Sequence, residues 1–182
     1  NYTLDFKTNN LEITEATLTV TADTQSKIYG SVDPTLTYKV LGLVNAEKES
    51  DVLVGSLTRI AGEDVGTYLI NKGTLVANGN YTLDFKTNNL EITPASLTVT
   101  ADTQSKTYGS VDPTLTYKVL GLVNAEKESD VLVGSLTRIA GEDVGTYLIN
   151  KGTLVANGNY TMTFTRSNLT ITPANLTVTA DA

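Results

Sequence analysis

Apolar and polar residues alternate along much of the chain with a period of two, the pattern that a half-buried β-strand requires. Residues 97–101 read Leu-Thr-Val-Thr-Ala, and residues 160–164 read Tyr-Thr-Met-Thr-Phe. The residue types are those that favour strands, mainly Val, Thr, Tyr and Ile. We therefore expect strands over five segments of this region: Leu97–Ala101, Leu115–Val119, Val144–Ile149, Tyr160–Phe164 and Leu169–Ile171.

Turn residues separate these segments, and one stretch departs from the alternation. Asp112-Pro113, residues 141–143 (Gly-Glu-Asp) and residues 157–159 (Asn-Gly-Asn) supply turn chemistry. Residues 124–132 carry good helix formers and predict a short helix of two turns or fewer. The pattern as a whole predicts a mostly β (α+β) fold with one short helix.

The whole pattern recurs at a period of 79 residues. Residues 1–79 and 80–158 differ at three positions only. A period of this length fits a small domain in a tandem array better than one turn of a solenoid. Near-identical copies present the same surface many times instead of assembling one catalytic centre, so the repetition itself is expected to be the function. The three differences are Glu15 against Pro94, Thr17 against Ser96, and Ile28 against Thr107.

Pro94 marks the expected junction between two copies. Proline lacks an N–H and biases the preceding Thr93 toward extended geometry, which suits a hand-over between two sheets. No flexible Gly/Ser linker separates the copies, so we expect domains arranged end to end in a stiff rod. The expected boundaries are 1–14 for the closing strands of a preceding repeat, 15–93 and 94–172 for complete repeats, and 173–182 for the first strand of a following repeat.

The charge and composition exclude several classes of function. The formal net charge is −7, the pI is near 4.5, and no basic run is present. Nucleic acids and anionic membrane surfaces are therefore not expected partners. The chain has neither Cys, which excludes disulfides and zinc–thiolate sites, nor His, the commonest general base and metal ligand. No apolar run is long enough to predict membrane insertion.

Several ordered motifs of the second copy resemble a known family. KTYGSVDPTLTYKV (Lys106–Val119), GSLTRIAGEDVGTYLINKGTL (Gly134–Leu154), NYTMTF and LTITPA occur at sensible spacings. In this they resemble the MBG, or "mostly beta-grasp", repeats of large bacterial surface proteins. The resemblance implies tandem β-grasp-like domains around a short helix, on an extracellular or cell-wall-attached adhesin. It supplies no catalytic residues.

Two groups of polar residues offer candidate chemistry. Glu126, Glu128 and Asp130, with Glu47, Glu49 and Asp51 in the first copy, form an alternating acidic run. Calcium needs six to eight oxygen ligands, and a DxDxDG-type loop is missing, so a solvated helix face is the preferred interpretation. Lys106 or Lys118 with Asn150, and Glu142 as the buried acid, are formally available for an intramolecular isopeptide bond. Glu142-Asp143 otherwise reads as a turn.

Tyrosines offer the third candidate. Tyr108, Tyr117, Tyr147 and Tyr160 could stack on sugars, but each lies in an alternating apolar pattern. The expected role is therefore core packing with the hydroxyl at the rim.

No nucleophile–base pair, metal-ligand set or phosphate-binding glycine motif is visible, so we expect no enzyme, no catalytic residue, no cofactor and no metal site. The expected function is a structural spacer that projects a distal binding region from a bacterial cell. The alternative is a multivalent module with weak carbohydrate- or protein-binding sites. Expected partners are neighbouring repeats, with a host glycan or protein contacting regions outside this sequence.

Overall fold

The computed structural model describes residues 1–180, which divide into two compact units. The units do not follow the sequence repeats everywhere, because two short loops of the first repeat belong to the second unit. The first unit comprises residues 1–26, 33–62 and 67–91, and the second comprises 27–32, 63–66 and the described residues from 92 onward.

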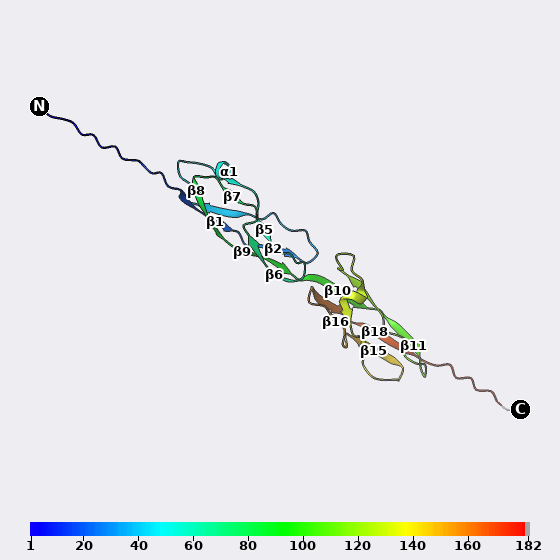
Figure 1. Ribbon diagram of the computed structural model, residues 1–182. Coiled ribbons are helices and arrows are strands. Elements are labelled where there is room, and N and C mark those ends of the chain that lie inside the picture. The colour runs from blue at the N-terminus through cyan, green and yellow to red at the C-terminus, as the bar shows by residue number, and fades with distance from the viewer. Residues whose placement is uncertain (181–182) are drawn as a thin grey trace. The chain divides into compact units, whose positions relative to one another are not determined.

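Each repeat carries the same order of short strands around one helical turn, so the predicted mostly β, tandem β-grasp-like fold is confirmed (Figure 1). The first repeat contains β1 (Ala16–Ala22), β2 (Gln25–Ile28), β3 (Tyr38–Leu41), α1 (Glu49–Val52), β4 (Leu53–Val54), β5 (Thr58–Arg59), β6 (Gly66–Asn71), β7 (Val76–Ala77), β8 (Tyr81–Lys86) and β9 (Asn88–Thr93). The second contains β10 (Ala95–Ala101), β11 (Gln104–Thr107), β12 (Tyr117–Leu120), α2 (Glu128–Val131), β13 (Leu132–Val133), β14 (Thr137–Arg138), β15 (Gly145–Asn150), β16 (Val155–Ala156), β17 (Tyr160–Thr165) and β18 (Ser167–Thr172).

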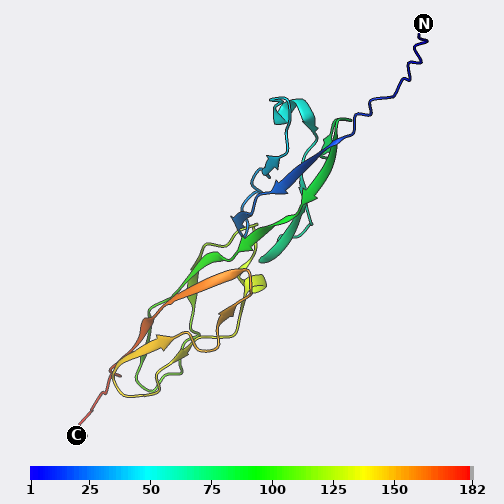
Figure 2. The same ribbon diagram turned by 90° about the vertical axis from the view of Figure 1, so that its left-hand side faces the viewer.

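The first two strands of the second repeat pair in parallel with its last two strands. Ala95 of β10 pairs with Tyr160 of β17, and Gln104 of β11 pairs with Leu169 of β18, with the same offset of 65 residues. Figure 2 shows β10 in green beside β17 in orange. One constant register therefore runs through two consecutive sheets, whose strand orders are β12-β10-β17 and β11-β18-β15-β14. The first repeat has the orders β3-β1-β8 and β2-β9-β6-β5.

The core follows from the alternation seen in the sequence. Every second residue of β10 is buried, and Leu97 and Val99 are fully inaccessible to solvent. Leu169 and Ile171 of β18 are equally buried. Removing each such side chain from water stabilises the fold by about 1.5–3 kcal/mol. The alternation predicted for these strands is confirmed.

The helix is shorter than its composition allows. Residues 124–132 carry helix formers, but α2 begins only at Glu128, because Asn124 and Ala125 have φ angles of 55° and 56°. That backbone region is incompatible with a right-handed helix. At the start of α2, the Lys127 N–H donates to Asp130 Oδ2 at 3.3 Å. The expected upper limit of two turns is confirmed by a helix of four residues.

Two further segments bear on the sequence expectations. Residues 1–15 and 173–180 lie in neither helix nor strand, so their pairing with further copies of the repeat stays a prediction. Among residues 1–180, no helix has the length and apolar character needed to cross a membrane.

Candidate functional site

A tight turn before each helix brings two polar groups together. The N–H of Glu47 donates to the carbonyl of Val44 at 3.0 Å, and the intervening Asn45 and Ala46 have φ angles of 53° and 57°. Positive φ at both central positions defines a type I′ turn, in which asparagine is common and alanine is strained. The turn places the Val44 N–H and the Glu47 carboxylate on the same side of the chain.

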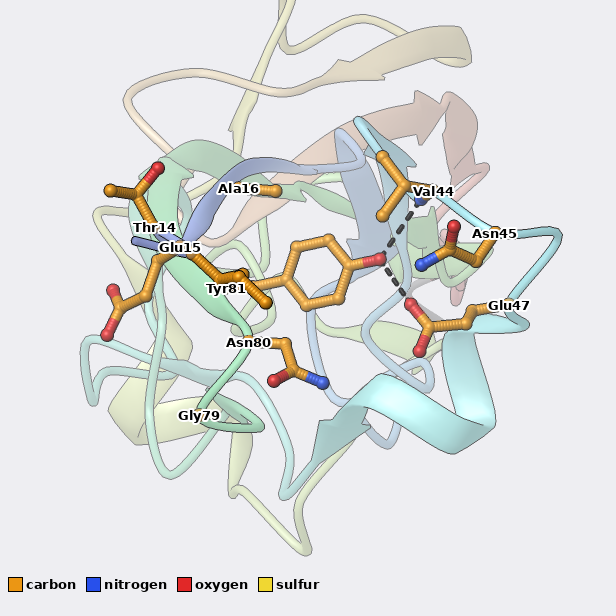
Figure 3. Close-up of a pocket in the computed structure, with 10 residues that line it drawn as sticks. Thr14, Glu15, Ala16, Val44, Asn45, Glu47, Gly79, Asn80 and Tyr81 are labelled. Atoms are coloured by element: carbon orange, nitrogen blue, oxygen red, sulfur yellow. Dashed lines mark hydrogen bonds between the residues drawn. The ribbon is translucent and has the colours of Figure 1, made fainter. Parts of the chain in front are cut away.

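The hydroxyl of Tyr81 lies between these two groups (Figure 3). Val44 N–H donates to the phenol oxygen at 3.0 Å, and the phenol donates in turn to Oε2 of Glu47. The hydrogen bond to Glu47 raises the pKa of Tyr81. The first residue of β8 is thereby fixed to the turn that precedes α1.

A pocket opens beside Tyr81 in the first unit. Its volume is about 310 Å³, at the lower end of the range for ligand pockets. Figure 3 shows the Tyr81 ring in the middle of the pocket, with the Glu47 carboxylate and the Asn80 amide beside it. The remaining lining residues are Ile13, Thr14, Glu15, Ala16, Val44, Asn45 and Gly79.

The same residues of the second repeat carry an additional ring. Tyr160, the counterpart of Tyr81, donates to Oε2 of Glu126 and accepts from the Val123 N–H at 3.0 Å. Tyr29, which belongs to the second unit, donates to Oε1 of Glu126 at 2.9 Å. The rings of Tyr29 and Tyr160 meet edge to face with centroids 5.4 Å apart. One carboxylate therefore accepts hydrogen bonds from two phenols.

Burial of these phenols changes their acidity. Burial and the hydrogen bond to Glu126 raise the pKa of Tyr160 to about 12. The same two causes raise the pKa of Tyr29. Both rings are therefore neutral hydrogen-bond donors over the physiological pH range.

Asn159 adds a second contact in the same unit. Its side-chain oxygen accepts from the Val65 N–H at 2.9 Å, and its amide nitrogen donates to Asp64 Oδ1 at 2.9 Å. Asn80, its counterpart in the first repeat, lines the pocket beside Tyr81. The residues that contact Asn159 come from the loop 63–66, one of the two loops that the second unit takes from the first repeat.

A network of charged residues lies elsewhere in each repeat. Arg138 forms a bidentate pair with Asp112, with N–O distances of 2.6 and 3.0 Å, and lies over the Tyr147 ring at 5.5 Å from its centroid. Lys106 Nζ, which is buried, lies 2.7 Å from Asp112 and 2.5 Å from Glu142. Hydrogen bonds from Arg138 and Lys106 lower the pKa of Asp112 to about 2. The first repeat has the matching pair of Arg59 with Asp33.

Glycine at position 141 makes room for this network. Gly141 has φ +149°, and a Cβ there would lie 2.1 Å from the Tyr147 ring. Its carbonyl accepts from Arg138 at 2.6 Å. The turn predicted for residues 141–143 therefore serves to position an arginine and not only to reverse the chain.

The acidic run separates into two kinds of residue. Glu128 and Asp130 both belong to α2 and are exposed, as predicted for a solvated helix face. That prediction is wrong for Glu126, which precedes the helix and accepts from Tyr29 and Tyr160. Within the described part of the chain, no group of three acidic side chains is placed to hold a metal ion.

The isopeptide candidates are only partly brought together. Lys106 does contact Glu142, the predicted acid, but it contacts Asp112 as well. These two carboxylates raise the pKa of the Lys106 amine, and a protonated amine is not a nucleophile. Asn150 lies opposite Thr137 in the β14–β15 pair. The contacts favour an ion-pair network.

The four tyrosines also differ from one another. Tyr160 is buried as predicted, and Tyr117 and Tyr147 are half-buried. The prediction is wrong for Tyr108, whose exposed fraction is 51%, whereas its counterpart Tyr29 is only 7% exposed. The one nearby sequence difference, the exposed Ile28 against Thr107, does not predict this, because Tyr29 is buried by contacts with Tyr160 and Glu126, which are distant in sequence.

Comparisons with known proteins identify the family. A search of curated proteins found no match. The family model for the MBG domain (YGX type) matches twice in tandem, over residues 18–91 and 97–170. Each match covers the tyrosine–glycine pair, the turn before the helix and the strand that begins at Tyr81 or Tyr160. The chain therefore belongs to the MBG domain (YGX type) family, of which it contains two tandem repeats.

Proposed function

We propose that these repeats are a non-catalytic structural spacer of a bacterial cell-surface adhesin, which holds a distal binding region away from the cell. The observation that carries the proposal is the connection between the repeats. β9 ends at Thr93 and β10 begins at Ala95, so Pro94 is the whole linker. Linkers rich in Gly and Ser behave as flexible coils, whereas proline fixes φ and restricts the residue before it.

Hydrogen bonds next to the linker support a stiff connection. The carbonyl of Thr93 accepts from the Tyr29 N–H at 2.8 Å, and its hydroxyl donates to the Lys27 carbonyl at 3.3 Å. The last residue before Pro94 is thus held on both its backbone and its side chain. The length of such an array grows with the number of repeats, while the contacts within each repeat stay the same.

The setting of the spacer forms part of the proposal. An extracellular position, attached to the cell wall, agrees with the MBG assignment, and the net charge of −7 suits a solubilised, crowded array. Neighbouring repeats are the proposed partners, and a host glycan or protein would contact regions outside this sequence. Nucleic acid binding and membrane insertion are not part of the proposed role.

A multivalent binding role has less support. The pocket beside Tyr81 has polar groups that a sugar could use, but Tyr29 fills the counterpart beside Tyr160. Within the described strands and loops of the two repeats, Tyr108 is the exposed tyrosine, and one ring does not make a stacking platform. The repeats therefore do not offer the same open site in each copy.

Small-angle scattering tests the spacer. The wild-type chain should give a narrow distribution of maximum dimensions, and replacing Pro94 with Gly-Gly-Ser should broaden it. A wild-type distribution as broad as that of the Gly-Gly-Ser variant would contradict the proposal. Binding of a glycan or matrix protein that strengthens from one repeat to two would favour the binding role instead.

A further inference from the structure

We propose that the pocket beside Tyr81 is a socket for the Tyr108–Ser110 loop of a second copy of this chain. The socket consists of Val44, Asn45, Glu47, Asn80 and Tyr81, and the plug is the Tyr108–Ser110 loop. The inference deepens the proposed spacer role and rests on it, because a spacer array brings many copies of the repeat together. It adds a specific surface through which one copy recognises another.

The first argument is that the same five residues form a filled site in the second unit. Their counterparts are Val123, Asn124, Glu126, Asn159 and Tyr160. There the Tyr29 hydroxyl donates to Glu126, and the Tyr29 ring packs edge-on against Tyr160. The socket and its filled counterpart share their sequence, their type I′ turn and their phenol–carboxylate hydrogen bond. The filled site therefore specifies which group fits the socket.

The second argument is that the plug is preformed. In the filled site the occupying loop is Tyr29-Gly30-Ser31, identical to Tyr108-Gly109-Ser110. Gly30 and Gly109 have φ angles of +82° and +84°, and the following serine N–H closes the same turn at 3.0 Å in both loops. The exposed Tyr108 loop thus already has the conformation of the docked Tyr29 loop.

The third argument is the difference in environment between the two loops. A Cβ on Gly30 would lie 2.5 Å from Val123 Cγ2, whereas a Cβ on Gly109 would have no neighbour within 4 Å. Tyr29 is 7% exposed and Tyr108 is 51% exposed. The plug is therefore open to solvent at Gly109, at the position where Gly30 of the docked loop packs against Val123.

The hydrogen-bonding groups also match. Glu126 uses Oε2 for Tyr160 and Oε1 for Tyr29, and Glu47 uses Oε2 for Tyr81. Oε1 of Glu47 is the acceptor that the Tyr108 hydroxyl would take. Asn80 would receive the Val144 N–H, as Asn159 receives the Val65 N–H. Val144 is exposed, in keeping with this second point of contact.

One edge-to-face ring pair and a few hydrogen bonds make a small contact. Such a contact is weak between separate molecules and is strengthened when a short linker supplies a millimolar effective concentration. The plug and the socket are different surfaces, so the contact is heterologous and extends into head-to-tail chains. We expect transient association of separate chains at about 1 mM.

Paramagnetic relaxation enhancement detects such transient complexes. The chain has no cysteine, so Val111→Cys provides a single attachment point for a nitroxide. Its counterpart Val32 is 89% exposed even though the Tyr29 loop is docked, so a label at this position leaves the contact free. The spin-labelled chain is mixed with the ¹⁵N-enriched wild-type chain, which has no cysteine and therefore carries no spin label. The amide signals of Val44, Asn45, Asn80 and Tyr81 should broaden, and those of their counterparts in the filled site should not.

Two variants make the test decisive. Tyr108→Ala in the spin-labelled chain changes an exposed side chain, so the fold should persist and the broadening should disappear. Glu47→Gln in the ¹⁵N-enriched chain should reduce the broadening at the socket. Unbroadened socket signals at about 1 mM, equal broadening of both sites, or broadening that survives Tyr108→Ala would overturn the inference. A flexible junction seen by scattering would remove the spacer role without changing these outcomes.

Discussion

The ring of Tyr29 meets the ring of Tyr160 edge to face, with an interplanar angle of 76°. An aromatic pair in this arrangement contributes about 0.5–1.5 kcal/mol beyond the burial of its surface. Both hydroxyls donate to Glu126, so packing and hydrogen bonding act on the same two side chains. The near-identical repeats supply a matched control for each residue of this cluster. The counterpart residue of the other repeat has nearly the same surrounding sequence but different neighbours in space.

Replacing Tyr29 with alanine should destabilise the second unit by about 3 kcal/mol, the usual cost of removing a buried aromatic side chain. Tyr108→Ala should change the free energy of unfolding by no more than about 0.5 kcal/mol, because Tyr108 is half exposed. Met162 is the single methionine, so its methyl NMR signal follows the second unit alone during urea unfolding. Equal effects of the two substitutions would contradict the difference in burial.

Gly30→Ala and Gly109→Ala separate backbone strain from a steric clash. Both glycines have a positive φ, so both substitutions should cost about 1 kcal/mol for the backbone. Gly30→Ala should cost a further 1–3 kcal/mol or so, because the new methyl group would overlap Val123. The same Met162 signal measures the two unfolding free energies. A difference within experimental error would show that the Tyr29 loop does not pack against Val123 in solution.

Much of the fold could be predicted from the sequence, because burial in the strands follows local alternation. Residues 97, 99 and 101 are buried as their pattern requires. The composition places helix formers over residues 124–132, more than the helix occupies. Asn124 and Ala125 have a left-handed backbone, and no glycine stands at either position to indicate it. Here the structure of the turn depends on Tyr160, whose hydroxyl holds both ends of it.

The contacts of the candidate site could not be predicted in the same way. The sequences around Tyr29 and Tyr108 differ nearby only at the exposed position before each tyrosine, Ile28 against Thr107. The difference in burial comes from residues about a hundred positions away. The pair of Arg138 with Asp112 joins residues 26 positions apart in separate loops. No periodicity reports on such contacts, because they depend on how the turns are placed and not on which face of a strand is buried.

The charged network predicts a loss of stability in acid. The Asp112 pKa is about 2 in the folded chain against an ordinary value of 3.8, chiefly because Arg138 donates hydrogen bonds to it. A depressed folded pKa gives stability that is present above pH 3.8 and is lost as the pH falls toward 2. Asp112→Asn removes this contribution, so stability should fall less steeply between about pH 4 and pH 2. Glu142, whose pKa Lys106 and Arg138 also lower, should leave a residual slope.

Urea midpoints of the second unit, measured across this pH range, check the expectation. The informative quantity is the slope of the unfolding free energy against pH, not its value at neutral pH, where loss of the ion pair also matters. Parallel slopes for the wild-type chain and Asp112→Asn would show that Asp112 titrates alike in the folded and unfolded states.

Glu126→Gln should lower the pKa of Tyr160 from about 12 toward its ordinary value of 10.0. Burial is the larger cause of the raised pKa and would persist, so the shift should be partial. A raised folded pKa gives stability that is present below pH 10 and is lost as the pH rises toward 12. At neutral pH the substitution should cost about 1–2 kcal/mol, because an amide is a weaker acceptor than a carboxylate for two phenols.

The Tyr160 ring carbon attached to the hydroxyl reports its titration by ¹³C NMR. Glu47→Gln is the matched control: it replaces the carboxylate acceptor of Tyr81, which raises the pKa of Tyr81, with a weaker amide acceptor, and it should leave the titration of Tyr160 unchanged. If Tyr160 titrates near pH 10 in the wild-type chain, or if Glu47→Gln shifts it as much as Glu126→Gln does, then Glu126 is not the acceptor that holds Tyr29 and Tyr160 together.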